Sequence, residues 1–436
     1  MRFRATLRFC VGLAGLIFIT AMPVSAADSR INAGDTAWML MATALVMLMT
    51  PGLGLFYGGM VRRKNVLATI LQSFILIGVV GVQWVLFGYS LAFGPDKWHL
   101  IGGLEWAGLR NVGLAPNDTY SSTIPHQAFM IFQMMFAVIT PALMTGAFAE
   151  RMRFKSFLIF TVLWATLVYD PVCHWVWAPG GWLRELGALD FAGGTVVHIC
   201  SGIAALACAV VIGKRQGFGK DDMVPHNVTM TIIGAALLWF GWFGFNAGSA
   251  LAANALAASA FVVTNTAAAA AALSWTFVEW WHRGKPTALG AATGAVAGLV
   301  AITPASGFVG PLAAIAIGAV VSLLCYFAIA MKSRLGYDDS LDVFGIHGVG
   351  GTWGALATGI FATVAINSAG GNGLLYGNAS LLAKQLVAIG AVFAYSFVAT
   401  VILLRVTGAF SDLRVSHEEE ESGLDLSQHG EIGYLF

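Results

Sequence analysis

Long apolar segments recur throughout this chain of 436 residues, and they constrain its fold more than any other feature. A helix of about 20 apolar residues is long enough to cross the hydrocarbon core of a bilayer. The chain is 58% hydrophobic and only 10% charged, whereas soluble domains carry about 25% charged residues. The sequence therefore predicts an all-α membrane protein with eleven transmembrane helices. Their predicted ranges are 37–59, 66–93, 127–149, 155–178, 192–213, 229–248, 252–278, 287–304, 308–332, 343–367 and 383–409.

The first 26 residues have the pattern of a secretory signal peptide. Three arginines among the first eight residues precede a short apolar run over residues 9–21, and Val24-Ser25-Ala26 offers the small residues that a signal peptidase recognises. Cleavage would leave the mature amino terminus outside the cytoplasm, and an uncleaved first helix is the alternative. The expected organisation is a signal peptide over 1–26, an eleven-helix membrane domain over 27–409 and a cytoplasmic tail over 410–436.

Basic residues are distributed unevenly between the two sides of this topology. Fifteen fall in the tail or in loops predicted to be cytoplasmic, and five fall in mature external segments. This asymmetry is what the positive-inside rule requires. It favours a multi-pass protein of the cytoplasmic membrane with its carboxyl terminus in the cytoplasm. The five external residues are Arg30, Lys97, Arg110, Arg184 and Lys384.

Two histidines lie inside apolar segments, His198 in GGTVVHICSG and His347 in VFGIHGVGG. An ionisable residue inside a membrane usually faces the protein interior and marks a functional path. The two histidines fall on the fifth and tenth predicted spans, and an aspartate precedes each of them, Asp190 and Asp342. Two groups of five helices run through the membrane in opposite senses, and such inverted repeats place a substrate path near the midplane. The sequence therefore predicts an inverted five-plus-five repeat with a pore in each subunit.

A pair of buried imidazoles offers a neutral, hydrogen-bonding lane. Neutral imidazole carries one donor and one acceptor, and burial disfavours its charged form. Such a lane suits a small molecule that can both donate and accept hydrogen bonds, and it excludes hydrated metal ions. The alternative is that both histidines are hydrogen-bonded packing residues between helices.

Aromatic residues form a second group of candidates. Phe132 and Phe136 are four residues apart and share a helical face, as do Phe245 and Ser249 in FGWFGFNAGSA. Trp164 lies near the middle of the fourth span. Aromatic faces attract small cations, and rings at a constriction can gate a channel by excluding water. Residues that merely face lipid or pack in the core would give the same spacing.

Other features narrow the class of protein. The net charge of +1 argues against nucleic acid as a partner. The five cysteines are scattered singly, without the spacing of a disulfide framework or a zinc site. Asp190 lies at the start of its span, where a carboxylate most often caps the free N–H groups, although it could also bind a cation. No metal and no cofactor is expected.

The segments LFYGG, GALDFAGGTVVHI, GWFGFNAGS, TPASG, DDSLDVFGIHGVGG and GLDLSQHGE, in this order, resemble the ammonium transporter family. This family includes the bacterial and plant ammonium transporters and the Rhesus-type proteins. The resemblance covers nearly the whole mature chain and implies a transporter rather than an enzyme. It also implies a homotrimer in the lipid bilayer, with one pore per subunit and a cytoplasmic face that a PII-type nitrogen regulatory protein can block.

The resemblance assigns roles to residues of this chain. The twin pore histidines would be His198 and His347, and Phe136 with Phe245 would form the gate. Ammonium recruitment outside would fall to Phe132, Phe136, Trp164 and Ser249. The supporting residues would be Asp190, Gln133, Trp242 and Thr303, with Asp342 placed before the second histidine.

The predicted function is ammonium uptake, in which the cation is recruited outside and crosses the histidine lane as ammonia with a separate proton. An ammonium sensor on the same fold, a membrane haem protein with two histidine ligands and passive gas conduction are the alternatives. Asp170 and the acidic run Glu418–Glu421 have no role assigned by the resemblance. The transported species, the proton stoichiometry and the rate are open from sequence.

Overall fold

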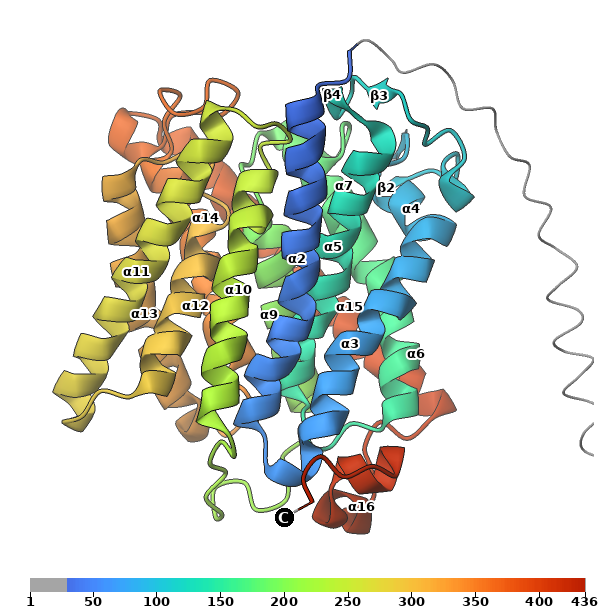
Figure 1. Cartoon of the computed structure of the whole chain (residues 1–436), viewed down its shortest axis with the longest axis vertical. Coiled ribbons are helices and arrows are strands. Elements are labelled where there is room, and N and C mark those ends of the chain that lie inside the picture. Colours follow the sequence, from blue (N-terminus) through green and yellow to red (C-terminus); the bar gives the residue numbers. More distant parts are fainter. Residues whose placement is uncertain (1–29, 436) are drawn as a thin grey trace, which may run out of the picture.

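Residues 30–435 form a bundle of long helices in the computed structural model (Figure 1). A helix satisfies every backbone hydrogen bond within its own segment, so apolar segments of this length are stable in lipid as helices. Nine helical units in this part of the chain are long and apolar enough to cross a membrane. Their helices are α2 (Ala33–Met60), α3 (Val66–Gln83) with α4 (Tyr89–Phe93), α5 (His126–Met144), α6 (Phe154–Trp164) with α7 (Asp170–Trp177), α9 (Cys200–Ile212), α10 (Val228–Gly248), α11 (Ala255–Arg283), α13 (Pro311–Leu335) and α15 (Ala379–Phe410).

Two of the eleven predicted spans correspond to shorter helices. The predicted span 287–304 is α12 (Ala288–Ile302), and 343–367 is a π-helical segment η8 (Phe344–Gly348) followed by α14 (Val349–Phe361). The count of eleven therefore stays a prediction. The predicted signal peptide lies outside the described residues.

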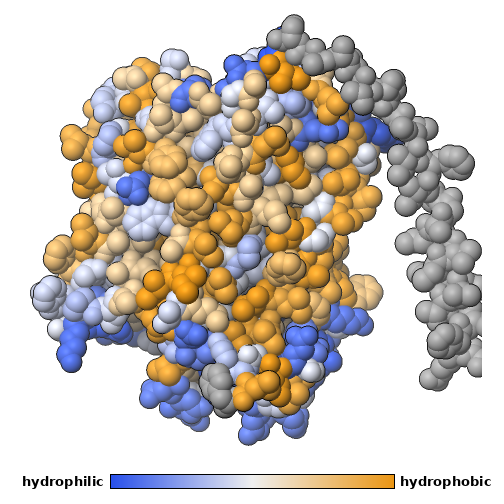
Figure 2. Space-filling model, viewed as in Figure 1, coloured by the Kyte–Doolittle hydropathy of each residue, from blue (hydrophilic) through white to orange (hydrophobic). Residues whose placement is uncertain are grey.

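The surface between the two ends of the bundle is apolar. Figure 2 shows hydrophobic side chains over most of the visible face, with hydrophilic ones gathered mainly at the lower end. Phe74, Val82 and Leu86 on α3 and its π-helical extension are each more than half exposed. Large exposed apolar side chains of this kind are expected where a protein surface meets lipid.

The two ends of the bundle carry different structures (Figure 1). One end carries two antiparallel hairpins, β1 (Asp96–Lys97) with β2 (Ile101–Gly102) and β3 (Pro116–Asn117) with β4 (Ser121–Pro125). The opposite end carries the tail, with α16 (His417–Ser422) and the π-helical segment η10 (Asp425–His429). These are called the hairpin end and the tail end below. The chain starts α2 at the hairpin end, where the Asn32 N–H donates to the Thr123 carbonyl at 2.8 Å.

Short π-helical segments interrupt several of the crossing helices. They include η3 (Trp84–Gly88), η6 (Ala165–Tyr169) and η7 (Gly194–Ile199), together with η8. Such segments are rare and frequently occur at functional sites. Both predicted pore histidines lie in them, His198 in η7 and His347 in η8.

The two histidine-bearing units cross in backbone contact. A Cβ atom on Gly202 would lie 2.1 Å from the backbone nitrogen of Gly348. Only glycine allows this approach, because any side chain at residue 202 would overlap the neighbouring backbone. The crossing brings residues that are 149 positions apart in sequence, His198 and His347, within hydrogen-bond distance.

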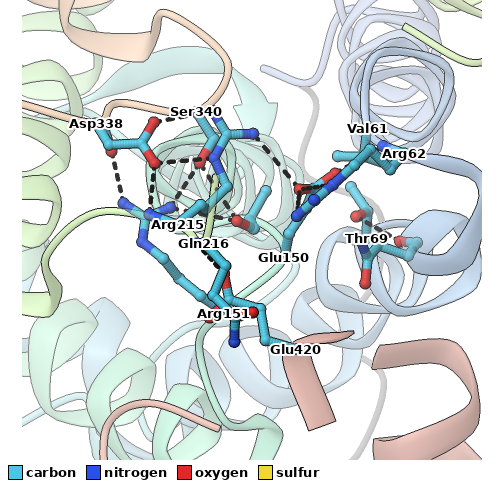
Figure 3. Close-up of polar contacts among 12 residues, drawn as sticks. Val61, Arg62, Thr69, Glu150, Arg151, Arg215, Gln216, Asp338, Ser340 and Glu420 are labelled. Atoms are coloured by element: carbon cyan, nitrogen blue, oxygen red, sulfur yellow. Dashed lines mark hydrogen bonds and ion pairs between the residues drawn. The ribbon is translucent and has the colours of Figure 1, made fainter. Parts of the chain in front are cut away.

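Buried charged side chains form hydrogen-bonded ion pairs that connect the loops at the tail end (Figure 3). The Arg215 guanidinium donates to both oxygens of Asp338, at 2.8 and 2.9 Å, and the Arg62 Nε donates to Glu150 at 2.7 Å. Burial alone would raise the pKa of the Asp338 carboxyl, but its hydrogen bonds and charge attraction to Arg215 outweigh burial and hold the pKa below its usual range. Arg151 donates to the backbone carbonyls of Ala147 and Asp338.

The tail packs against this end through its own polar contacts. The Glu420 carboxylate accepts from Arg414 at 2.6 Å and from the Gln216 N–H at 2.7 Å. The Asp425 carboxylate accepts from the N–H groups of Leu67 and Ala68, at 3.0 and 2.8 Å, and so caps the start of α3.

The buried pair predicts a large effect of Asp338→Ala on stability. The substitution leaves the Arg215 charge buried without its bidentate partner, and breaking a buried pair in this way costs about 3–5 kcal/mol. We expect a clearly lower thermal unfolding midpoint of the detergent-solubilised protein. Glu105→Ala is the matched control, because Glu105 pairs with Lys97 on the exposed surface of the hairpin end, and its midpoint should stay close to that of the unmodified chain. Equal midpoints for both variants would contradict the prediction.

Candidate functional site

A cavity of about 150 Å³ opens at the hairpin end and is called the hairpin-side cavity. Its walls combine aromatic rings with a few polar groups. Helix α5 contributes Gln133 and Phe136, α7 contributes Trp177, and Ser249, which directly follows α10, lines the cavity as well. The other lining residues are Phe93, Thr119, Tyr120, Phe129, Arg184, Phe191 and Leu251.

Two phenylalanine rings, tilted by 40° to each other, lie at the deep end of this cavity. The ring centroids of Phe136 and Phe245 are 4.3 Å apart, and the Trp177 ring stands edge-on to Phe136 at 5.6 Å. Phe136 lines the hairpin-side cavity, whereas Phe245 lines the next cavity along the bundle. The pair therefore lies between the two cavities, and its role as a gate stays an expectation from the family resemblance.

The next cavity, called the histidine cavity, holds only about 10 Å³. That is close to the space of a single water-sized probe. His198 and His347 are its ionisable residues, and its other walls are apolar or aromatic. These walls are Met49, Leu53, Phe56, Ile139, Leu143, Val197, Leu238, Trp242, Phe245 and Val296.

The two imidazoles face each other through their Nδ1 atoms. These atoms are 3.2 Å apart, and the ring planes are inclined by 23°. One Nδ1 must carry the proton and donate it to the other, because two bare nitrogens or two N–H groups would repel each other. Within residues 30–435 the buried Nε2 atom of His198 has no hydrogen-bond partner. The pair is therefore held by one shared proton and keeps a free ring nitrogen.

Trp242 and Thr303 hold the ring of His198 in place. The Trp242 indole is stacked against His198 with centroids 5.4 Å apart, and its Nε1 donates to the Thr303 hydroxyl at 2.9 Å. The Thr303 hydroxyl in turn donates to the Leu299 carbonyl at 2.7 Å. Trp242 thus contacts one of the two imidazoles, and Thr303 holds the Trp242 indole in place.

A third cavity of about 70 Å³ continues toward the tail end and is called the tail-side cavity. His347 lines both this cavity and the histidine cavity, and Phe56 and Val296 do so as well. Tyr57 and Asp342 are among its polar lining residues. The three cavities therefore form one series through the bundle, interrupted at the phenylalanine pair and at the histidine pair.

The Asp190 carboxylate caps the segment that carries His198. Its oxygens accept from the N–H groups of Gly193, Gly194 and Thr195 at 2.6–2.7 Å, and from the Thr195 hydroxyl. It does not line any of the three cavities. The geometry agrees with the capping interpretation of Asp190 and offers no direct contact with a solute.

The structure places Asp339, not Asp342, in the corresponding position of the second half. The Asp339 carboxylate accepts from the Phe344 N–H at 2.7 Å at the start of η8. It lies eight residues before His347, as Asp190 lies eight residues before His198. The sequence comparison of Asp342 with Asp190 was therefore wrong, and the equal spacing would have identified Asp339. Asp342 instead pairs with Lys332 beside the tail-side cavity.

Trp164 also lies away from the site predicted for it. It is fully buried on α6, and its Nε1 donates to the Thr400 hydroxyl at 3.0 Å. A residue in the middle of a span cannot reach a cavity at the end of the bundle, whereas Trp177 at the end of the same span lines that cavity. Its position in the span was the signal that sequence reasoning missed.

The remaining predicted residues lie at or behind the hairpin-side cavity. Ser249 lines it and donates to the Phe245 carbonyl at 2.9 Å. Gln133 lines it too, and its buried Oε1 has no hydrogen-bond partner among the described residues. Phe132 is fully buried and supports Phe136 edge-on, with centroids 5.0 Å apart. Sequence reasoning did not identify Tyr120, Phe129 or Arg184 as lining residues.

The described residues hold no group of three or more histidine, cysteine, aspartate or glutamate side chains that could bind a metal ion. The four cysteines between residues 30 and 435 are buried free thiols. The three cavities are lined by aromatic and apolar side chains, the two imidazoles and a few polar groups, with Arg184 as a charged residue on the hairpin side and Asp342 on the tail side.

Comparisons with known proteins give a consistent result. The model of the Ammonium Transporter Family matches residues 37–434. The ammonium transporter of Bacillus subtilis is 58% identical over 402 residues, which cover 92% of this chain and 98% of that protein. Ammonium transporter Amt1 of Archaeoglobus fulgidus is 52% identical over 401 residues, covering 92% and 99%.

Solved structures agree with the sequence relatives. The crystal structure of Saccharomyces cerevisiae Mep2 is 39% identical, with a TM-score of 0.84, and the match covers 90% of this chain and 89% of that one. A structure described as a sensor Amt protein is 31% identical, also with a TM-score of 0.84, and the match covers 91% and 98%.

Proposed function

This chain belongs to the ammonium transporter family, and we propose that it recruits the ammonium cation in the hairpin-side cavity and conducts it along the histidine lane. Its activity is ammonium transport across a membrane, in agreement with the relatives named above. The observation that carries the proposed route is the series of three cavities. An aromatic cavity leads through the Phe136–Phe245 constriction to a cavity whose only ionisable walls are His198 and His347.

Recruitment of the cation rests on neutral groups in the hairpin-side cavity. The faces of Phe136 and Trp177 attract a cation, and a cation–π contact of this kind is worth about 0.5–2 kcal/mol. The Ser249 hydroxyl and the unpartnered Gln133 Oε1 add oxygen acceptors for the N–H groups of ammonium. Charged ligands are not needed, because a cation that must move on is best held weakly.

Passage through the histidine cavity favours ammonia over the intact cation. The cavity is too small for a hydrated ion, and moving a bare charge into apolar surroundings is costly. Ammonia can donate to and accept from the two imidazoles as it passes. The proton can move separately through the Nδ1–Nδ1 hydrogen bond and the free Nε2 of His198. Charge then crosses without a bare ammonium ion entering the lane.

The rival interpretations have less support. The close sequence relatives are named ammonium transporters, so the findings support transport and not the sensor alternative. The haem interpretation conflicts with the geometry, since two metal–nitrogen bonds of about 2 Å would separate the facing nitrogens by about 4 Å, more than the observed 3.2 Å.

The membrane arrangement is part of the proposal. We place eleven spans within residues 27–409 of a mature chain whose signal peptide, residues 1–26, has been removed. The hairpin end faces outward and the tail, residues 410–436, faces the cytoplasm of an inner membrane. An odd number of crossings is supported by the start of α2 and the tail, which lie at opposite ends of the bundle (Figure 1).

The repeat and the assembly are proposed on structural and family grounds. Aspartate-capped π-helical segments, η7 with Asp190 and η8 with Asp339, support an inverted five-plus-five repeat. We also propose a homotrimer with one pore per subunit. A PII-type protein at the tail end is the proposed regulatory partner, and co-purification with such a protein tests it.

Electrical recording from proteoliposomes tests the proposed route. An ammonium concentration jump should produce a saturable inward current that protein-free liposomes do not show and that sodium or potassium jumps do not produce. Ammonium flux no greater than that of empty liposomes would contradict the proposal.

Two tryptophans of one span provide a matched test of the recruitment site. Trp177→Leu removes an aromatic face from the hairpin-side cavity and should raise the half-saturation concentration of ammonium roughly 2- to 30-fold, the equivalent of a cation–π contact. Trp164→Leu should leave this concentration unchanged in the folded protein, because Trp164 is buried elsewhere. A shift with Trp164→Leu and none with Trp177→Leu would refute the assignment.

A further inference from the structure

One wall of the hairpin-side cavity carries a positive charge. Arg184 lies on the short helix α8 (Trp182–Leu186) and lines the cavity together with aromatic rings and neutral polar groups. It is exposed to the water at the hairpin end. A guanidinium is charged at every physiological pH. A cavity that attracts a cation through its rings therefore also repels it through one residue.

No acid neutralises this charge within residues 30–435. The NH1 group of Arg184 donates to the Trp177 carbonyl, and no carboxylate lies within ion-pair distance of the guanidinium. By contrast, the guanidinium of Arg215 at the tail end forms an ion pair with the Asp338 carboxylate. Arg184 thus presents an uncompensated positive charge next to the residue that carries a cation-binding ring.

We propose that Arg184 is a specificity-determining residue that lowers the affinity of the hairpin-side cavity for monovalent cations. This inference rests on the proposed recruitment of ammonium in that cavity. At a separation on the order of 7 Å, a like charge in a water-like dielectric weakens the binding of a monovalent cation roughly threefold. Weak binding favours transport, because tight binding of the substrate lowers the half-saturation concentration without raising the maximal rate.

The hydrogen bond to Trp177 offers a different role for the same residue. In that role Arg184 only fixes the backbone before the Trp177 ring, and its charge is incidental. The two roles differ in what substitutions do. Arg184→Gln removes the charge and keeps an N–H donor, whereas Arg184→Lys keeps the charge and loses the planar fork.

The test measures ammonium-dependent current of the full chain in proteoliposomes at low and high ionic strength. At 0.01 M salt the screening length is about 30 Å, and above 0.1 M it falls below about 10 Å. We expect Arg184→Gln to lower the half-saturation concentration of ammonium about threefold at low salt. The difference in half-saturation concentration between Arg184→Gln and the unmodified chain should shrink at high salt. Arg184→Lys should retain the half-saturation concentration of the unmodified chain, because it keeps the charge.

Arg110→Gln is the control for surface charge. Arg110 is an exposed arginine at the hairpin end that donates to the Ala107 and Leu104 carbonyls and does not line the cavity. Its removal changes the net charge equally and should not shift the half-saturation concentration. Three results would overturn the inference: no shift with Arg184→Gln, a rise in half-saturation that Arg184→Lys shares, or an equal shift with Arg110→Gln.

Failure of the inference can be told apart from failure of the proposed function. If the unmodified chain shows saturable current and Trp177→Leu weakens it, recruitment in the cavity stands, and an unshifted Arg184→Gln overturns the charge role alone. If the unmodified chain shows no saturable current, the recruitment proposal fails, and the role of Arg184 fails with it.

Discussion

Replacing both His198 and His347 by alanine is expected to abolish the proton-coupled part of ammonium conduction. The double substitution removes the Nδ1–Nδ1 hydrogen bond and the free Nε2, and it leaves a wholly apolar lane. A buried hydrogen-bonding partner stabilises a polar solute by about 1–3 kcal/mol. The ammonium-dependent current should therefore fall by roughly tenfold or more. Electrical recording and the alkalinisation of the vesicle interior, followed together, separate charge movement from the entry of ammonia.

A third histidine provides the control for this experiment. His282 shares a hydrogen bond with the Tyr326 hydroxyl at 2.8 Å and lines none of the three cavities of the proposed route. His282→Ala should therefore keep the current. Undiminished and selective current in the double variant would refute the relay. Loss of current with continued entry of ammonia would instead show that the lane passes ammonia and that the histidines carry the proton.

Asp190→Ala is expected to destabilise the protein and to end transport. The carboxylate accepts from three backbone N–H groups at the start of η7, and alanine would leave these buried donors without an acceptor. Each unsatisfied buried donor costs about 1–3 kcal/mol, so a loss of several kcal/mol is expected. Because η7 carries His198, the ring would also lose its fixed position in the lane. Thermal unfolding in detergent and ammonium current should both be measured.

Comparison with related carboxylates sharpens this prediction. Asp190→Asn keeps one oxygen acceptor and should fall between the native chain and the alanine variant. Asp339→Ala should behave like Asp190→Ala because Asp339 caps η8 before His347. Asp190→Ala with native thermal stability but no current would show that the carboxylate acts on the cation directly and not as a cap.

Much of the fold could be predicted because lipid makes helix formation a local requirement. Each apolar segment must satisfy its own backbone hydrogen bonds, so nine of the predicted spans appear as long helices. The two histidines could be singled out for a related reason, whereas the Phe136–Phe245 pair was assigned by the family resemblance. A polar ring inside an apolar segment is costly wherever it lies, and the sequence alone reveals that cost.

The errors concern which side chains meet. Trp164 and Trp177 belong to one span and both are tryptophans, but only their distance from the end of the bundle decides which of them lines the hairpin-side cavity. Asp339 and Asp342 are three residues apart, and the backbone path before η8 decides which carboxylate reaches the free N–H groups. Neither the tryptophan that lines the cavity nor the aspartate that caps η8 can be identified from neighbouring residues in the sequence, because both depend on the position of the segment in the folded bundle.

The sequence by itself therefore determined the membrane class, most spans, the family and the buried histidine pair, because each follows from transfer energies or motifs carried within single segments. The tertiary structure decided the Nδ1–Nδ1 contact, the position of Trp177 in the cavity wall, the cap on η8 and the place of Arg184 in the hairpin-side cavity. These depend on close approach between helices far apart in the chain, such as the backbone contact at Gly202, which no single segment encodes.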